Sequence, residues 1–159
     1  MIEKADAEGL AAREALAGRV RNELAAAGLP VLAPGLDPIL SGGAQVSVDR
    51  SVDATGGVFI KWQTGPRLRE CSIRAVRLDQ PDELVLRHFS AVRTAMMEAI
   101  GAILASAGFR AEDPHDEYRP NQLQVLDGPP AEPKLTWQLR REEVEMPGRT
   151  HRADEGDAG

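Results

Sequence analysis

Residues 44–64 read AQVSVDRSVDATGGVFIKWQT, and this stretch decides the fold class. Apolar side chains occupy every second position near both of its ends, a period that is typical of half-buried β-strands. A Gly-Gly pair precedes the second run and favours a turn between the two. The stretch therefore predicts a β-hairpin, with Phe59 and Lys61 facing away from the apolar side of the second strand. The alternating apolar residues are Ala44, Val46 and Val48 in the first run and Val58, Ile60 and Trp62 in the second.

Apolar stripes of helical period flank the hairpin on both sides and predict helices over residues 3–27 and 80–107. Gly28 and Gly108 each follow the last periodic residue and can take the left-handed conformation that ends a helix. Asp79 is expected to cap the start of the second helix. The stripes consist of Ala12, Leu16, Val20, Leu24 and Ala27 in the first helix and of Val85, Phe89, Val92, Met96, Ile100, Ile103 and Ala107 in the second.

Residues 66–78 allow two interpretations. The positions of Leu68, Cys71 and Ala75 fit one face of a helix, and Pro66 suits the first turn of one. A strand also fits, because Arg74 and the residues two positions before and after it would share one face of a strand, opposite the residues between them. The helical interpretation is slightly favoured, and it places Cys71 on the apolar, buried face.

Two further strands are expected nearer the C-terminus, over 121–126 and 135–139, because Leu and Val or Trp alternate there with polar residues. With the hairpin they make about four strands. We therefore expect an α+β protein in which two long helices pack on one face of a small antiparallel sheet, as a two-layer sandwich. Residues 1–144 form the expected single domain, and residues 145–159 the expected disordered acidic tail.

Composition narrows the class of protein. The chain has 159 residues and a net charge of −6, and its single Cys excludes a disulfide framework and a multi-Cys zinc site. No apolar run approaches the roughly 20 residues that cross a bilayer, and the charged start does not resemble a signal peptide. We expect a cytoplasmic protein with no cofactor and no membrane partner. The 16 Arg against 3 Lys resemble the coding bias of a GC-rich bacterium.

The only basic segment lies in the middle of the chain, where residues 44–78 carry a net charge of +3 between acidic flanks. Its arginines, with Trp62 or Phe59 to stack on a base, make a nucleic-acid-associated regulator one hypothesis. The acidic residues Asp79 and Glu83 that follow disfavour it, because they repel phosphate. The candidate nucleic-acid-binding residues are Arg67, Arg69, Arg74 and Arg77.

One loop could carry metal chemistry. A His flanked by carboxylates can bind a divalent cation or combine an acid with a base, which gives the hypothesis of a metal-assisted hydrolase. Adjacent loop residues rarely converge on one ion, so an ordinary solvated loop is the favoured interpretation. The weak candidate ligands are Asp113, His115, Asp116 and Glu117.

No phosphate-binding loop, GxGxxG, HExxH or CxxC motif occurs in the chain. The absence of catalytic motifs, the acidic balance and the long apolar stripe within residues 80–107 favour a non-catalytic interaction or accessory protein. Such a protein is expected to associate with itself as a homodimer, and to bind a protein partner.

Overall fold

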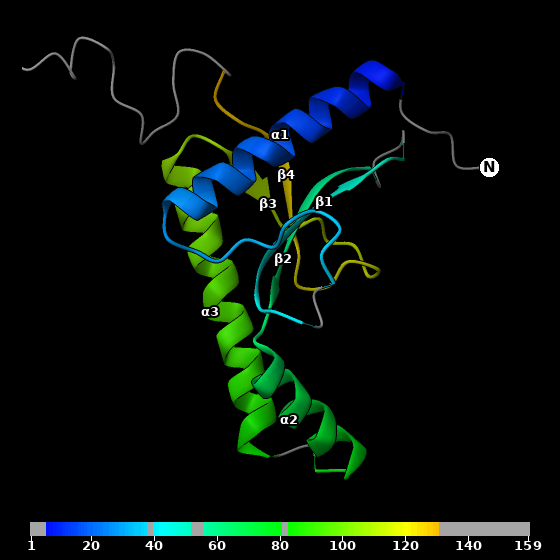
Figure 1. The fold of residues 1–159 in the computed structure, drawn as a ribbon, viewed down its shortest axis with the longest axis vertical. Coiled ribbons are helices and arrows are strands. Elements are labelled where there is room, and N and C mark those ends of the chain that lie inside the picture. Colours follow the sequence, from blue (N-terminus) through cyan, green and yellow to red (C-terminus); the bar gives the residue numbers. More distant parts are fainter. Residues whose placement is uncertain (1–5, 38–39, 52–55, 81–82, 131–159) are drawn as a thin grey trace, which may run out of the picture.

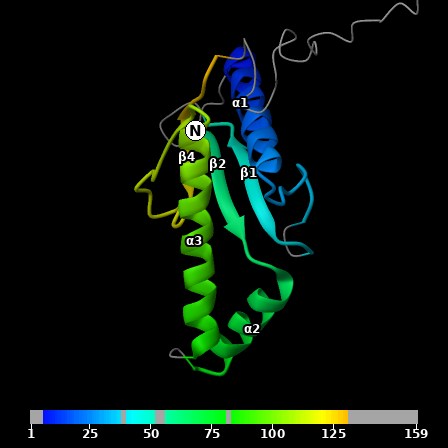
Figure 2. The same cartoon turned by 90° about the vertical axis from the view of Figure 1, so that its left-hand side faces the viewer.

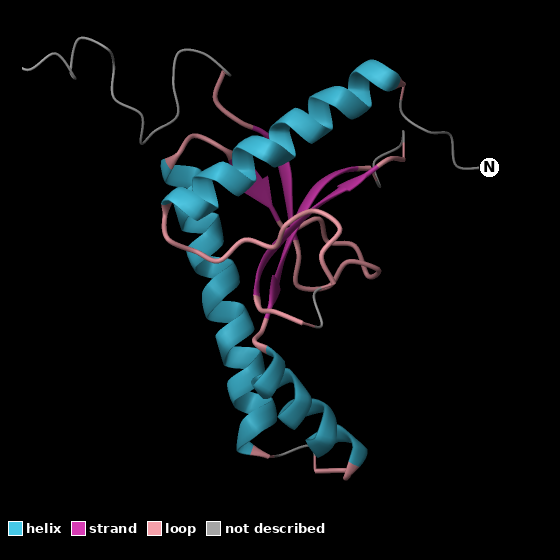
Figure 3. Ribbon diagram, in the orientation of Figure 1, coloured by secondary structure: helices cyan, strands magenta, loops and turns pink. Residues whose placement is uncertain are grey.

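The computed structural model describes residues 6–37, 40–51, 56–80 and 83–130, and shows an α+β fold with three helices and four strands in this part of the chain (Figures 1 and 3). The helices are α1 (Ala7–Ala26), α2 (Pro66–Arg77) and α3 (Leu84–Ser106). The strands are β1 (Gly43–Asp49), β2 (Gly57–Gln63), β3 (Arg110–Glu112) and β4 (Leu123–Asp127).

The four strands form one antiparallel sheet in the order β1-β2-β4-β3. β1 and β2 are the predicted hairpin, with Val46 opposite Ile60 and Val48 opposite Val58. β2 also pairs with β4, so the hairpin supplies one edge strand and one central strand of the sheet.

The sequence pattern does not predict β3, and it predicts a strand over 121–126 where the structure has β4 at Leu123–Asp127. β3 has only three residues, which are too few to show a period, and it lies just before the loop that carries the candidate metal ligands at 113–117. It forms because the turn at Gly108 directs the chain back along β4, where Arg110 pairs with Asp127 at 3.0 Å. The expected strand over 135–139, the end of the expected domain and the expected tail all lie outside the described residues.

Both long helices end as their glycines predict. Gly28 and Gly108 have φ angles of 90° and 86°, a region that a residue with a Cβ rarely adopts. The Leu29 N–H then donates to the Leu24 carbonyl at 3.1 Å, and the Phe109 N–H donates to the Leu104 carbonyl at 2.9 Å. Each helix is closed by the same hydrogen-bond pattern.

The expected cap at Asp79 is wrong. α3 begins only at Leu84, and Glu83 precedes it without a side-chain capping bond. Asp79 instead has a φ of 53° and lies just after the end of α2, where the Gln80 N–H donates to the Ala75 carbonyl at 3.0 Å. The residue therefore ends one helix rather than starting the next, since Asp tolerates the left-handed conformation better than most side chains.

Residues 66–77 are helical, which settles the open choice in favour of α2. Only Ser72 and Ala75 of this helix are buried, and α2 packs on α3. Cys71 is exposed, so its expected place on a buried face is wrong. No described element covers the side of α2 that carries it.

The hydrophobic core joins α1, the C-terminal half of α3 and the sheet. Its largest fully buried side chains are Phe59, Leu24, Ile60, Ile100, Leu104, Val20 and Val58. All of these except Phe59 belong to one continuous cluster with Val46 and Val125. Phe59 points to the other side of β2 and is covered separately.

The rest of the helical structure extends away from this core. α2 and the first half of α3 form a hairpin of helices that projects beyond the end of the sheet (Figures 1 and 2). We call this part, residues 66–95, the arm. Within its described residues only Ser72 and Ala75 are buried.

Candidate functional site

The predicted metal loop is organised by its own backbone. The Asp113 Oδ1 accepts from the His115 N–H at 2.8 Å, and the Asp116 Oδ1 accepts from the Tyr118 N–H at 2.9 Å. These are the turns that Asp side chains form with residues two positions on. The His115 ring is 88% exposed and its Nδ1 lies 3.8 Å from Asp113, while Glu117 is exposed to solvent. The carboxylates thus shape the loop.

The loop does not gather a ligand set. In the part of the chain that the structure describes, no three His, Cys, Asp or Glu side chains come together in a group that could hold a metal ion. The four candidates from 113 to 117 are all among the residues described, and metal binding there remains a prediction without geometric support.

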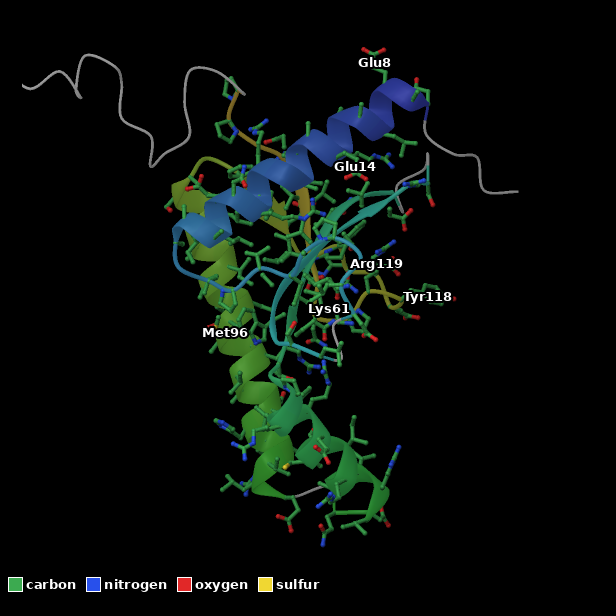
Figure 4. The ribbon with its side chains drawn as sticks, in the orientation of Figure 1. Glu8, Glu14, Lys61, Met96, Tyr118 and Arg119 are labelled. Carbon is green, nitrogen blue, oxygen red and sulfur yellow. The ribbon has the colours of Figure 1, made fainter. Side chains whose placement is uncertain are left out.

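A residue that the sequence analysis did not single out, Arg119, links this loop to the sheet. Its guanidinium lies 3.8 Å from the centre of the Phe59 ring, and it pairs with Asp49 at the end of β1 and with Asp116 in the loop, the latter at 3.7 Å. The loop therefore covers Phe59, which is 1% exposed. Figure 4 shows Arg119 beside the sheet and Tyr118 pointing away from it.

Asp49 is the titratable group that this contact changes. Burial by itself would raise the pKa of Asp49, but hydrogen bonds from Ser51 and from the Arg119 guanidinium outweigh burial, so the pKa lies below its usual value. A lowered pKa means that the charged form stabilises the folded state. The contribution is complete above about pH 4, the ordinary pKa of Asp, and is lost as the pH falls through the lower folded pKa.

We expect an Asp49→Asn variant to lose about 1 kcal/mol of unfolding free energy at pH 7, because the amide keeps the shape and removes the charge. The difference from the wild type should shrink as the pH falls below about 4. Urea denaturation over a pH series measures both. Asp127→Asn is the control: its ion pair is exposed and should contribute under about 0.5 kcal/mol. An equal loss in both variants would contradict the role given to Asp49.

The four arginines predicted to bind nucleic acid all lie on α2. Arg69, Arg74 and Arg77 line a hollow of about 440 Å³ along one face of the helix. Glu70 lines the same hollow and lies 3.6 Å from Arg74. Arg67 is exposed in the first turn. The helix thus presents a basic face that one carboxylate partly neutralises.

The aromatic partners expected for that function do not join these arginines. Phe59 is buried beneath Arg119, and Trp62 packs partly against the core. Neither ring offers an open face on α2 on which a base could stack, so the base-stacking part of the hypothesis is wrong for Phe59.

The arm carries more exposed large apolar side chains than the rest of the described chain. Of the seven large apolar side chains exposed among the described residues, four belong to the arm. Val76, Leu78 and Leu84 are 65%, 62% and 70% exposed, and Ile73 is 46% exposed. Val76, Leu78 and Leu84 lie at or beside the turn between α2 and α3, at the end of the arm farthest from the sheet, and Ile73 lies within α2. Clustered exposed apolar side chains indicate an interaction surface.

α3 is unusual among the helices. Among the described residues it is the one helix that is long and apolar enough, by length and composition, to cross a membrane, and 11% of its most apolar window is buried. Its C-terminal half nevertheless packs on α1, β2 and β3. The helix is therefore a core element at its C-terminal end, while its first half packs on α2 with its apolar side chains half-buried or exposed.

Comparison with models of protein families, with curated proteins and with solved structures finds no match to this chain.

Proposed function

We propose that this chain is a non-catalytic interaction protein that forms a homodimer through the arm, and that the paired arms support the binding of a protein partner. The observation that carries the proposal is the exposure of Val76, Leu78 and Leu84 at the arm's end. In the proposed architecture, α1 and α3 form one layer on one face of the sheet, as a two-layer sandwich. The arm then projects from the edge of that sandwich.

The energetics of α2 support a partner at this surface. A helix of 12 residues is marginal when isolated in water, and its stability in proteins comes from burying one face. α2 buries only Ser72 and Ala75, two small side chains, against α3. A second layer of helices over the remaining apolar side chains would supply the missing burial.

The charges of the arm are compatible with a second copy as that layer. Residues 66–95 contain six arginines and four acidic residues, and both signs occur toward each end of α2, where Glu70 follows Arg69 and Asp79 lies close after Arg77. Arg67 and Arg69 lie in the first turn of α2, while Asp79 and Glu83 lie near the arm's end. Two arms related by a two-fold axis and packed antiparallel would place Asp79 and Glu83 of one beside Arg67 and Arg69 of the other. The four helices would then form a bundle with the apolar side chains inside.

Sedimentation of the full chain tests this proposal. We expect a dimer at micromolar concentration, and about a 100-fold weaker association in Val76→Glu and in Leu84→Glu, because each variant places a charge in the apolar centre of the interface. Circular dichroism should show that both variants keep their helices, since the two side chains are exposed.

Leu40→Glu provides a matched control. Leu40 is the same residue type as Leu84 and is similarly exposed, at 75%, but it lies outside the arm. Its variant should dimerise like the wild type. Dimerisation through the arm would be refuted by a wild-type chain that remains monomeric at about 100 times the micromolar concentration at which we expect a dimer. It would also be refuted by a Leu40→Glu variant that dissociates as readily as Leu84→Glu.

A further inference from the structure

β1 lies at an edge of the sheet, and within the described residues another backbone segment pairs with its open side at one residue, Ala44. The Ala44 N–H donates to the Pro30 carbonyl at 2.8 Å, and the Ala44 carbonyl accepts from the Leu32 N–H at 2.9 Å. Alternate residues of an antiparallel strand direct their backbone groups to the same side, so Val46 and Val48 also face this open side. An edge strand of this kind is a template on which another chain can add a strand.

Side chains of α1 cover the part of β1 that the backbone leaves open. Arg21 donates to the Val46 carbonyl at 2.9 Å, and its Nε is buried, so this side chain is packed against the strand rather than extended into water. Arg13 donates to the carbonyls of Asp49 at 2.8 Å and of Ser51 at 2.6 Å, where β1 ends. Figure 2 shows α1 running beside β1. The helix is therefore fastened to the edge strand at two places, through charged donors.

We propose that Arg21 closes the open side of β1 against pairing with β1 of a second copy of the chain. Two copies related by a two-fold axis would pair antiparallel, and each would need the Val46 carbonyl as an acceptor for the other. Arg21 already holds this carbonyl, and a hydrogen bond from a charged donor is stronger than one from a backbone N–H. Pairing would have to break that bond and move a guanidinium that is packed against the strand. The contact is thus autoinhibitory.

The sequence of β1 fits a second copy as the strand that is kept out. Antiparallel pairing centred on Val48 places Asp49 of one copy opposite Ser47 of the other, and Arg50 opposite Val46. No like charges then lie opposite each other, so the exposed run does not repel its own copy. Without Arg21, nothing in the charge pattern of the strand itself would prevent this pairing.

The consequence for assembly rests on the proposed dimer through the arm. A chain with two different two-fold interfaces links its copies into an open-ended assembly unless the two axes intersect. If the arm and the β1 edge both paired, each chain would carry two such interfaces. Closure of the edge by Arg21 limits the assembly to the dimer through the arm.

Sedimentation of full-length Leu84→Glu, in which contact through the arm is disrupted, tests the edge by itself. Addition of Arg21→Ala should strengthen self-association at least about tenfold, because a hydrogen bond from a charged group no longer competes for the Val46 carbonyl. Arg21→Lys keeps a charged donor and should associate no more than the parent variant. Asn22→Ala is the matched control on the same helix, since Asn22 is exposed, and it should also behave like the parent.

Amide hydrogen exchange followed by NMR locates the new contact. In Leu84→Glu with Arg21→Ala, protection of the Val46 and Val48 N–H groups should rise with protein concentration. The Ser47 N–H faces β2 and should stay protected in every variant, which verifies that the sheet is folded. Addition of Val48→Pro should abolish the association, because proline is tolerated where the N–H of an edge strand faces outward but cannot donate to a second copy.

Three results would overturn the closure of the edge by Arg21. They are association of the Arg21→Ala variant no tighter than that of its parent, equal association in Asn22→Ala, and association without protection of Val46 and Val48. In a chain that keeps Leu84, Arg21→Ala should form assemblies larger than a dimer. Dimers alone, with Val46 and Val48 protected, would refute the dimer through the arm and leave the closure by Arg21 standing.

Discussion

Replacement of Leu24 by alanine is expected to lower the free energy of unfolding by about 3 kcal/mol. Leu24 is 0% exposed and belongs to the cluster that joins α1 to the sheet and α3. The shorter side chain loses its transfer free energy and leaves a cavity that rigid neighbours fill only partly. For a domain whose total stability is about 5–15 kcal/mol, this loss shifts the urea midpoint strongly without changing the slope of the transition.

Leu36→Ala is the control for this measurement. Leu36 lies in the segment 32–36 and is 50% exposed, so its replacement should cost under about 1 kcal/mol. Equal losses in the two variants would mean that α1 does not contribute the core contacts described above.

The elements that the sequence predicts are those whose determinants are local. The hairpin over 44–64 follows from alternation within each strand, and the ends of α1 and α3 follow from Gly28 and Gly108, which supply the required backbone conformation themselves. Helical residues 66–77 were harder to predict, because Ser72 and Ala75 are the only side chains that α2 buries, and neither gives a strong pattern.

The features that the sequence misses depend on contacts between distant residues. Arg119 is one of several polar residues in its loop, and nothing near it indicates that it covers Phe59 or pairs with Asp49, 70 positions away. The one available signal was Phe59 itself, a large aromatic residue on the face of β2 that also carries Lys61. β3 is too short for any periodic signal and exists only because β4 lies beside it.

The apolar stripe of α3 is another feature whose burial depends on distant residues and could not be predicted from the sequence pattern. It is continuous in the sequence from Val85 to Ala107, but the structure buries Ile100 and Leu104 and leaves the stripe residues of the first half, such as Val85 and Phe89, only half-buried. Period and composition cannot distinguish the two halves, because both have the same spacing of apolar residues. The position of the sheet decides which half joins the core and which half extends beyond it with α2.

An Ala75→Glu variant is expected to separate α2 from α3 while the core stays folded. Ala75 is 5% exposed where the two helices meet, and a carboxylate there would be buried without a partner. This cost exceeds what a helix of 12 residues recovers from its own hydrogen bonds, so α2 should unfold. Because α1 and α3 have 20 and 23 residues, the helical signal in circular dichroism should fall by about a fifth.

Val76→Glu distinguishes this effect from the introduction of a charge into α2 as such. Val76 is the next residue and is 65% exposed, so a carboxylate there remains in water in the monomer and α2 should stay helical. Both variants should weaken dimerisation, one by removing the arm's structure and the other by changing only its surface. Amide protection in β1 and β2 should persist in both, because the sheet buries its core against α1 and the other half of α3. Loss of that protection in Ala75→Glu would show that the arm and the core unfold together. Weaker dimerisation of that variant could then not be assigned to the arm alone.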